Sequence, residues 1–87
     1  MKVFCLNRPN GEFDTPIAEL NRELMRRINK ELPVVSVDTV EGDSLARVYD
    51  VTQYPAVVVT SDSGELVHSW QEGSLPLINE LSYYLDQ

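Results

Sequence analysis

Apolar residues along the chain follow the two repeats that distinguish strands from helices. Three short runs, 2–7, 34–40 and 56–60, are rich in β-branched and apolar residues, which predicts strands. The first run alternates little, which is typical of a strand covered on both faces. A fourth run, 65–70, does alternate and follows the turn residues 61–64, so it predicts an antiparallel hairpin with the run before it. The pattern therefore predicts four strands.

The longest segment between these strands carries apolar residues at helical spacing. Asp14 or Thr15 can cap its start, Pro16 suits its first turn, and Pro33 is expected to end it. The expected apolar stripe consists of Ile17, Leu20, Leu24, Ile28 and Leu32. The segment predicts an amphipathic helix that packs on a sheet.

Two further helices are expected. Gly42 and Asp43 break the second strand, and Asp43 or Ser44 can cap a short helix. That helix is expected to direct three residues inward: Leu45, Val48 and Tyr49. A last helix is expected to open at Gly73 and Ser74, with Pro76 in its first turn. One side of it should hold Leu77, Ile78, Leu81, Tyr84 and Leu85.

The resulting order is βαβαββα. Two strands joined by a long helix run parallel with a right-handed crossover, whereas the closing hairpin is antiparallel. A four-stranded mixed sheet with helices on both faces buries every apolar stripe. The sequence thus predicts an α/β fold, with residues 1–87 forming one domain.

Charge and composition exclude several classes of function. Seven Lys and Arg against fourteen Asp and Glu leave a formal charge of −7, which argues against nucleic acid or an anionic membrane as partner. No apolar run approaches the ~20 residues that cross a bilayer, and the N-terminus lacks a signal pattern, so we expect a cytoplasmic protein. One cysteine and one histidine are a poor ligand set, and neither a metal nor another cofactor is expected.

The segment Leu45–Val59 resembles the thioredoxin superfamily: a helix ending in an aromatic residue and Val, a short loop, a residue before proline, and an apolar strand. The N-terminal part is more similar to glutaredoxins, which begin with the strand that bears the active-site loop. Residues 8–14, Arg-Pro-Asn-Gly-Glu-Phe-Asp, stand where a glutaredoxin shows Arg or Lys, Pro, a small residue and then Cys-Pro-Tyr-Cys. The resemblance implies a thioredoxin-like βαβαββα fold over essentially the whole chain.

The resemblance also implies that the Tyr54–Pro55 peptide bond is cis. The Tyr54 backbone would then face the site, where relatives pair it with an extended substrate peptide. The alternative is that Pro55 only starts a strand, at a position where its missing N–H costs nothing.

The chemistry of the family is missing from the first loop. Thiol–disulfide exchange needs a thiolate, but the resemblance aligns Gly11 with the nucleophile and Asp14 with the resolving cysteine. Asp14 is expected to accept hydrogen bonds from the free N–H groups of the first helical turn. The one thiol, Cys5, lies in mid-strand, where we expect a buried core residue. No catalytic residue is therefore predicted, and an enzyme is not the favoured class.

The favoured hypothesis is a redox-inactive domain that binds a protein or an extended peptide in the former substrate groove. Phe13 and Tyr54 would be its aromatic anchors, and Arg8 could hold a carboxylate of the partner. The candidate groove residues are Arg8, Asn10, Gly11, Glu12, Phe13, Asp14, Gln53, Tyr54, Pro55, Glu72, Gly73 and Ser74.

Two alternatives remain. One is a glutathione-binding or thiol-dependent oxidoreductase of the glutaredoxin type, which would hold glutathione near Ser74, although Glu72 would repel the carboxylates of glutathione. The other is a structural role in which an edge strand or the face around Trp70 pairs with a second copy.

Overall fold

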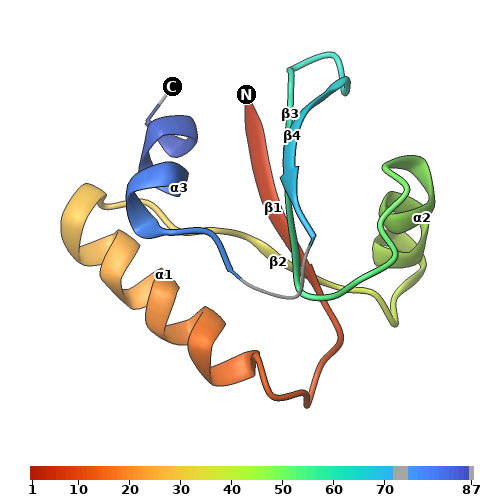
Figure 1. The fold of residues 1–87 in the computed structure, drawn as a ribbon, viewed down its shortest axis with the longest axis horizontal. Coiled ribbons are helices and arrows are strands. Elements are labelled where there is room, and N and C mark those ends of the chain that lie inside the picture. The colour runs from red at the N-terminus through yellow and green to blue at the C-terminus, as the bar shows by residue number, and fades with distance from the viewer. Residues whose placement is uncertain (72–74, 87) are drawn as a thin grey trace.

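The strands form one mixed sheet in the order β2-β1-β3-β4 in the computed structural model, which describes residues 1–71 and 75–86. The elements along the chain are β1 (Lys2–Asn7), α1 (Asp14–Ile28), β2 (Val34–Ser36), α2 (Val40–Val48), β3 (Ala56–Thr60), β4 (Leu66–Trp70) and α3 (Ile78–Leu85). β1 runs parallel to β2 and antiparallel to β3, and β4 is antiparallel to β3. Helices α1 and α3 cover one face and α2 covers the other (Figure 1). The predicted βαβαββα order and mixed sheet are confirmed.

The core consists of two layers separated by the sheet. Between the sheet and the α1–α3 pair lie Val3, Cys5, Ile17, Leu24, Leu32, Val57, Val59 and Leu81. Between the sheet and α2 lie Leu6, Ala46, Val51, Ala56 and Val58. Every residue of β3 is buried, because this strand is central and both of its faces are covered.

Helix α1 ends earlier than the sequence predicts. It stops at Ile28, and Asn29 adopts the left-handed conformation at φ 55° while its N–H donates to the Met25 carbonyl. Pro33 therefore does not end the helix. The chain between α1 and β2 is held by Asn21, whose Oδ1 accepts the Leu32 N–H at 2.6 Å and whose Nδ2 donates to the Leu32 carbonyl at 3.0 Å. This pairing keeps Leu32 in the core although it lies outside the helix.

Strand β2 is shorter, and α2 begins earlier, than predicted. The helix starts at Val40 because Thr39 caps it, accepting the Gly42 N–H on Oγ1 at 3.0 Å. Gly42 is therefore a helical residue and not a strand breaker. A Cβ at this position would lie 1.9 Å from the Ser36 carbonyl oxygen, so glycine lets α2 approach the end of β2 closely. The prediction that Val48 points inward is wrong, since Val48 is 68% exposed.

Helix α3 also differs from its predicted start. It begins at Ile78, after Pro76, and Leu77 at its N-cap is 70% exposed instead of inward. The Glu80 carboxylate accepts the Leu77 N–H at 3.3 Å and takes the place of a capping side chain. Gly73 and Ser74, the expected start, lie outside the described residues.

Among the described residues, no helix combines the length and the apolar character that a membrane span requires.

Candidate functional site

Asp14 organises the loop that joins β1 to α1. Its Oδ2 accepts the backbone N–H of Asn10 at 2.8 Å, and its Oδ1 accepts a hydrogen bond from Asn7 Nδ2 at 3.1 Å. Asn10 has φ 61°, which turns its N–H toward this carboxylate. The N-cap of α1 is Phe13, without a side-chain capping bond, so the predictions that Asp14 or Thr15 caps the helix and that Asp14 accepts from its first turn are wrong. The carboxylate instead fixes the shape of the loop.

This loop and the residue before Pro55 enclose an open hollow of about 210 Å³, here called the first-loop hollow. Its lining consists of Asn7, Arg8, Gly11, Glu12, Phe13 and Tyr54. The loop residues follow β1, and Tyr54 precedes β3, the neighbour of β1 in the sheet. Adjacent strand ends thus bring together residues that are more than forty positions apart in the sequence.

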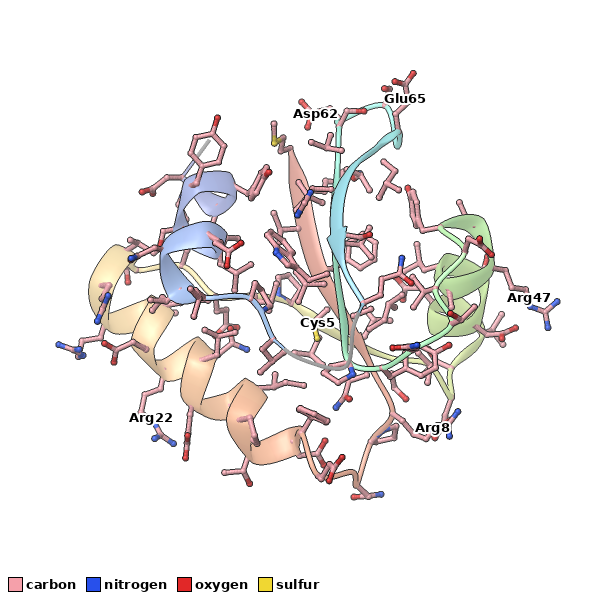
Figure 2. The ribbon with its side chains drawn as sticks, in the orientation of Figure 1. Cys5, Arg8, Arg22, Arg47, Asp62 and Glu65 are labelled. Atoms are coloured by element: carbon pink, nitrogen blue, oxygen red, sulfur yellow. The ribbon has the colours of Figure 1, made fainter. Side chains whose placement is uncertain are left out.

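Arg8 and Tyr54 face each other in the first-loop hollow. The guanidinium carbon of Arg8 lies 5.7 Å from the centroid of the Tyr54 ring, within the range of a cation–π contact. Arg8 is exposed at the end of β1 (Figure 2), and no carboxylate of the described residues forms an ion pair with it. Its donors therefore remain open to a bound carboxylate.

Phe13 and Glu12 complete the chemistry of the hollow. Phe13 is half-buried and packs against the core between α1 and the sheet, so its ring is supported from behind. Glu12 is exposed and contributes a carboxylate. The hollow therefore offers two aromatic surfaces, one cation and one anion, which suits binding by contact and hydrogen bonding.

The remaining candidate residues lie elsewhere. Gln53 is exposed and Pro55 is buried behind a cis peptide bond from Tyr54, and neither lines the hollow. Asn10 acts through its bond to Asp14, and Asp14 lines a separate hollow of about 270 Å³ beside α1. Glu72, Gly73 and Ser74 lie outside the described residues.

Asn7 is a lining residue that the sequence hypothesis missed. It is only 7% exposed, and besides donating to Asp14 it accepts the Val37 N–H on its backbone carbonyl. The sequence did offer a signal for Asn7: it is a polar residue at the end of an apolar strand, just before a turn. Asn7 thereby links the hollow to the start of the segment after β2.

Cys5 is sealed in the core. Its exposed fraction is 0%, and burial raises the pKa of the thiol to about 12. At pH 7 only about one thiol in 10⁵ would then be ionised. The side chain packs on the α1 side of the sheet, and it does not line the first-loop hollow (Figure 2). The structure therefore presents no sulfur at the hollow.

Residues 1–71 and 75–86 contain no group of three His, Cys, Asp or Glu side chains that could hold a metal ion. His68 is exposed on β4, where its ring lies 4.5 Å from the Trp70 ring and 5.9 Å from the Tyr84 ring.

Comparison with known proteins bears on the fold. No protein-family model matches the chain, and no curated protein sequence matches it. A solved structure of thioredoxin from Plasmodium falciparum is similar, with a TM-score of 0.62 and 13% identical residues over 98% of this chain and 82% of that chain. The chain therefore has a thioredoxin-like fold, as the resemblance implied.

Proposed function

We propose that this thioredoxin-like chain is a redox-inactive module that binds an extended peptide or protein segment in the first-loop hollow. The observation that carries the proposal is the pairing of Arg8 and Tyr54 across a hollow that no sulfur lines. The position that suits thiol chemistry in this fold would then serve for non-covalent binding alone.

The lining favours a peptide that brings an apolar side chain and a carboxylate. Aromatic residues dominate interface energetics, and here Phe13 and Tyr54 both line the hollow. The Arg8 guanidinium can bind a carboxylate of the partner with two parallel hydrogen bonds. The partner is an extended segment because the hollow lies at the ends of β1 and β3, where a backbone can pair with the chain before Pro55.

The burial of Cys5 supports redox inactivity. A nucleophilic thiol must be ionised and accessible, whereas the Cys5 thiol has a raised pKa and no exposed surface. A single buried free thiol also suits a reducing compartment, and we place the protein in the cytoplasm.

The proposal is tested with a displayed library of short, unstructured peptides. Selected peptides are expected to shift the amide resonances of Arg8, Phe13 and Tyr54. Changing Phe13 or Tyr54 to Ala should weaken their binding at least about tenfold. Val48→Ala is the control, because Val48 is exposed on α2 and does not line the hollow. Peptides that bind with unchanged affinity to the Phe13 and Tyr54 variants would reject the hollow as the site.

The oxidoreductase alternative is tested by insulin reduction and by exchange with glutathione disulfide. We expect no turnover in either assay. Turnover that disappears in Cys5→Ala would contradict redox inactivity, whatever the peptide result.

A further inference from the structure

The seven Lys and Arg residues of the chain are confined to positions 2–47. Positions 48–87 hold six carboxylates and no Lys or Arg. This second part forms β3, β4 and α3. Figure 2 shows the separation: Arg8, Arg22 and Arg47 project from the first loop, α1 and α2, and Asp62 and Glu65 stand at the tip of the β3–β4 hairpin. The described carboxylates of the β3–β4 hairpin and of the α3 segment are Asp62, Glu65, Glu80 and Asp86, and neither these segments nor β4 contain Lys or Arg, so the surface that they build favours cationic partners.

Strand β4 is an edge strand with an apolar sequence. In the part of the chain that the structure describes, no strand pairs with its outer side. Leu66 and Val67 are 50% and 44% exposed, and the strand contains neither a charged residue nor a proline. Edge strands of natural proteins usually carry charged residues or proline, which prevent pairing with another chain. In β4 the protection consists of an irregularity in its pairing with β3 near Val67. The outer side of β4 is thus able to accept another strand.

The register identifies the backbone groups that such a strand would use. Ser61 donates its N–H to the Glu65 carbonyl at 2.8 Å across the hairpin, so alternate residues of β3 point their backbone groups at β4. Val59 and Val57 continue this alternation opposite His68 and Trp70. The N–H and C=O of Ser69, which lies between them, therefore face away from β3.

Aromatic rings line the face of the sheet beside this edge. The Trp70 ring lies 5.6 Å from the Tyr84 ring, and the Tyr84 ring lies 5.0 Å from the Tyr83 ring. His68 stacks on Tyr84 with an interplanar angle of 9°. Tyr83 is 64% exposed, so the group is open to solvent on its outer side. Aromatic faces at an exposed position attract Lys and Arg side chains.

A carboxylate without a cationic partner lies beside these rings, and a second one stands at the tip of the β3–β4 hairpin. Glu80 accepts the Trp70 Nε1–H on Oε2 at 3.3 Å, which holds its charge at the edge of the indole. Among residues 1–71 and 75–86, neither Glu80 nor Glu65 forms an ion pair, whereas Asp62 pairs with the N-terminal amine and Asp86 with Lys30. A cation above Trp70 would therefore meet a carboxylate that is still unpaired.

We propose that the outer edge of β4 binds a cationic, extended peptide segment as an added strand. Its backbone pairs with Ser69, and alternate Lys or Arg side chains lie over the rings of Trp70, Tyr84 and Tyr83. A second copy of this chain is a poorer occupant, because it would bring its own unpaired Glu65 and Glu80 toward this edge. This surface shares no residue with the first-loop hollow, so the two proposals stand separately.

The probe is an acetylated and amidated peptide that alternates Lys and Val, with a Glu–Val peptide as the matched control. The Lys–Val peptide is expected to shift the amide resonances of residues 66–70 and 83–84 and to slow hydrogen exchange at Ser69. Its affinity should fall as salt concentration rises, because opposite charges are screened. The Glu–Val peptide should not bind.

Two variants separate the contributions of backbone and rings. Ser69→Pro removes the outward N–H and should abolish binding, whereas Ser69→Ala keeps it and should bind as the parent does. Tyr83→Leu should weaken binding about two- to fivefold, the range of an exposed cation–π contact. Val48→Ala, at an exposed position of α2 on the other face of the sheet, is the control and should bind normally. Circular dichroism confirms that each variant is folded.

Three results would overturn the proposal: equal binding of both peptides, unchanged affinity of a folded Ser69→Pro variant, or resonance shifts confined to the first-loop hollow. A sedimentation mass that rises with protein concentration, without a response to the Lys–Val peptide, would assign the edge to a second copy and would also reject it.

Discussion

The guanidinium of Arg8 lies over the ring of Tyr54, 5.7 Å from its centroid, where the C-terminal end of β1 meets the N-terminal end of the antiparallel strand β3. Both belong to the first-loop hollow, and Arg8 is exposed to solvent. The contact therefore aligns two groups of the proposed binding site without contributing much to folding.

We expect Arg8→Met to lower the free energy of unfolding by no more than about 1 kcal/mol, because an exposed cation–π contact contributes about 0.5–1 kcal/mol. Urea denaturation measures the change. Arg22→Met, an exposed arginine of α1, is the control and should have almost no effect. A loss of several kcal/mol at Arg8 would show that the contact is structural.

The raised pKa of Cys5 makes stability depend on pH in the alkaline range. The thiol has a pKa of about 12 in the folded chain, against an ordinary value of 9.0. Below pH 9 the thiol is protonated in both states, so its contribution is fully present. Above pH 9 the unfolded chain loses the proton first, and stability should fall by about 1.4 kcal/mol per pH unit toward pH 12.

Denaturation at several pH values between 8 and 10.5 measures that slope. Cys5→Ala has no thiol to titrate, so its curve should lack the Cys5 contribution. Parallel curves for the two proteins would mean that the thiol is not buried.

Gly42→Ala should destabilise the fold although alanine favours helices. The new Cβ would lie 1.9 Å from the Ser36 carbonyl oxygen, so α2 must shift away from β2. Overpacking of this kind costs about 1–3 kcal/mol, which exceeds the gain in helix propensity of about 1 kcal/mol. Ser44→Ala, at an exposed position of the same helix, should be neutral or stabilising. Equal melting temperatures for the two variants would contradict the close approach.

Asn21→Ala should lower the free energy of unfolding by about 2 kcal/mol. The change leaves both the N–H and the carbonyl of Leu32 without their partner in a partly buried site. Asn21→Asp retains the acceptor for the Leu32 N–H but loses the donor to the Leu32 carbonyl. Its free energy of unfolding should therefore lie between those of the parent and Asn21→Ala. Asn79→Ala on exposed α3 surface is the control. Thermal denaturation should give the highest melting temperatures for the parent and Asn79→Ala, a lower one for Asn21→Asp and the lowest for Asn21→Ala.

The order of elements was predictable from local pattern, whereas their ends were not. Runs such as Ala56–Thr60 are apolar enough to indicate a central strand without other information. The end of α1 at Ile28 depends on Asn29 and on the pairing of Asn21 with Leu32, a contact across eleven residues. Leu32 fits the helical stripe yet reaches the core from a loop, so the spacing alone was misleading.

Glycine and aspartate explain the other differences. Gly42 reads as a break in the sequence, but its role is to let a helix touch the end of β2. Asp14 reads as a helix cap, but its two hydrogen bonds point back into the loop, to Asn7 and Asn10. Both roles depend on the partner that tertiary structure brings to the residue. Asn7 was missed for the same reason, because its contact with Asp14 and its place in the first-loop hollow exist only in the folded chain.

The burial of Cys5 also makes the natural chain a convenient background for spectroscopic labelling. Its sulfur has no exposed surface, so a maleimide probe should not react with it under native conditions. A cysteine introduced at exposed Gln53, beside the first-loop hollow, or at exposed Tyr83, beside β4, would then carry a single dye. Each surface could be observed separately during a titration, with no need to remove the native thiol first.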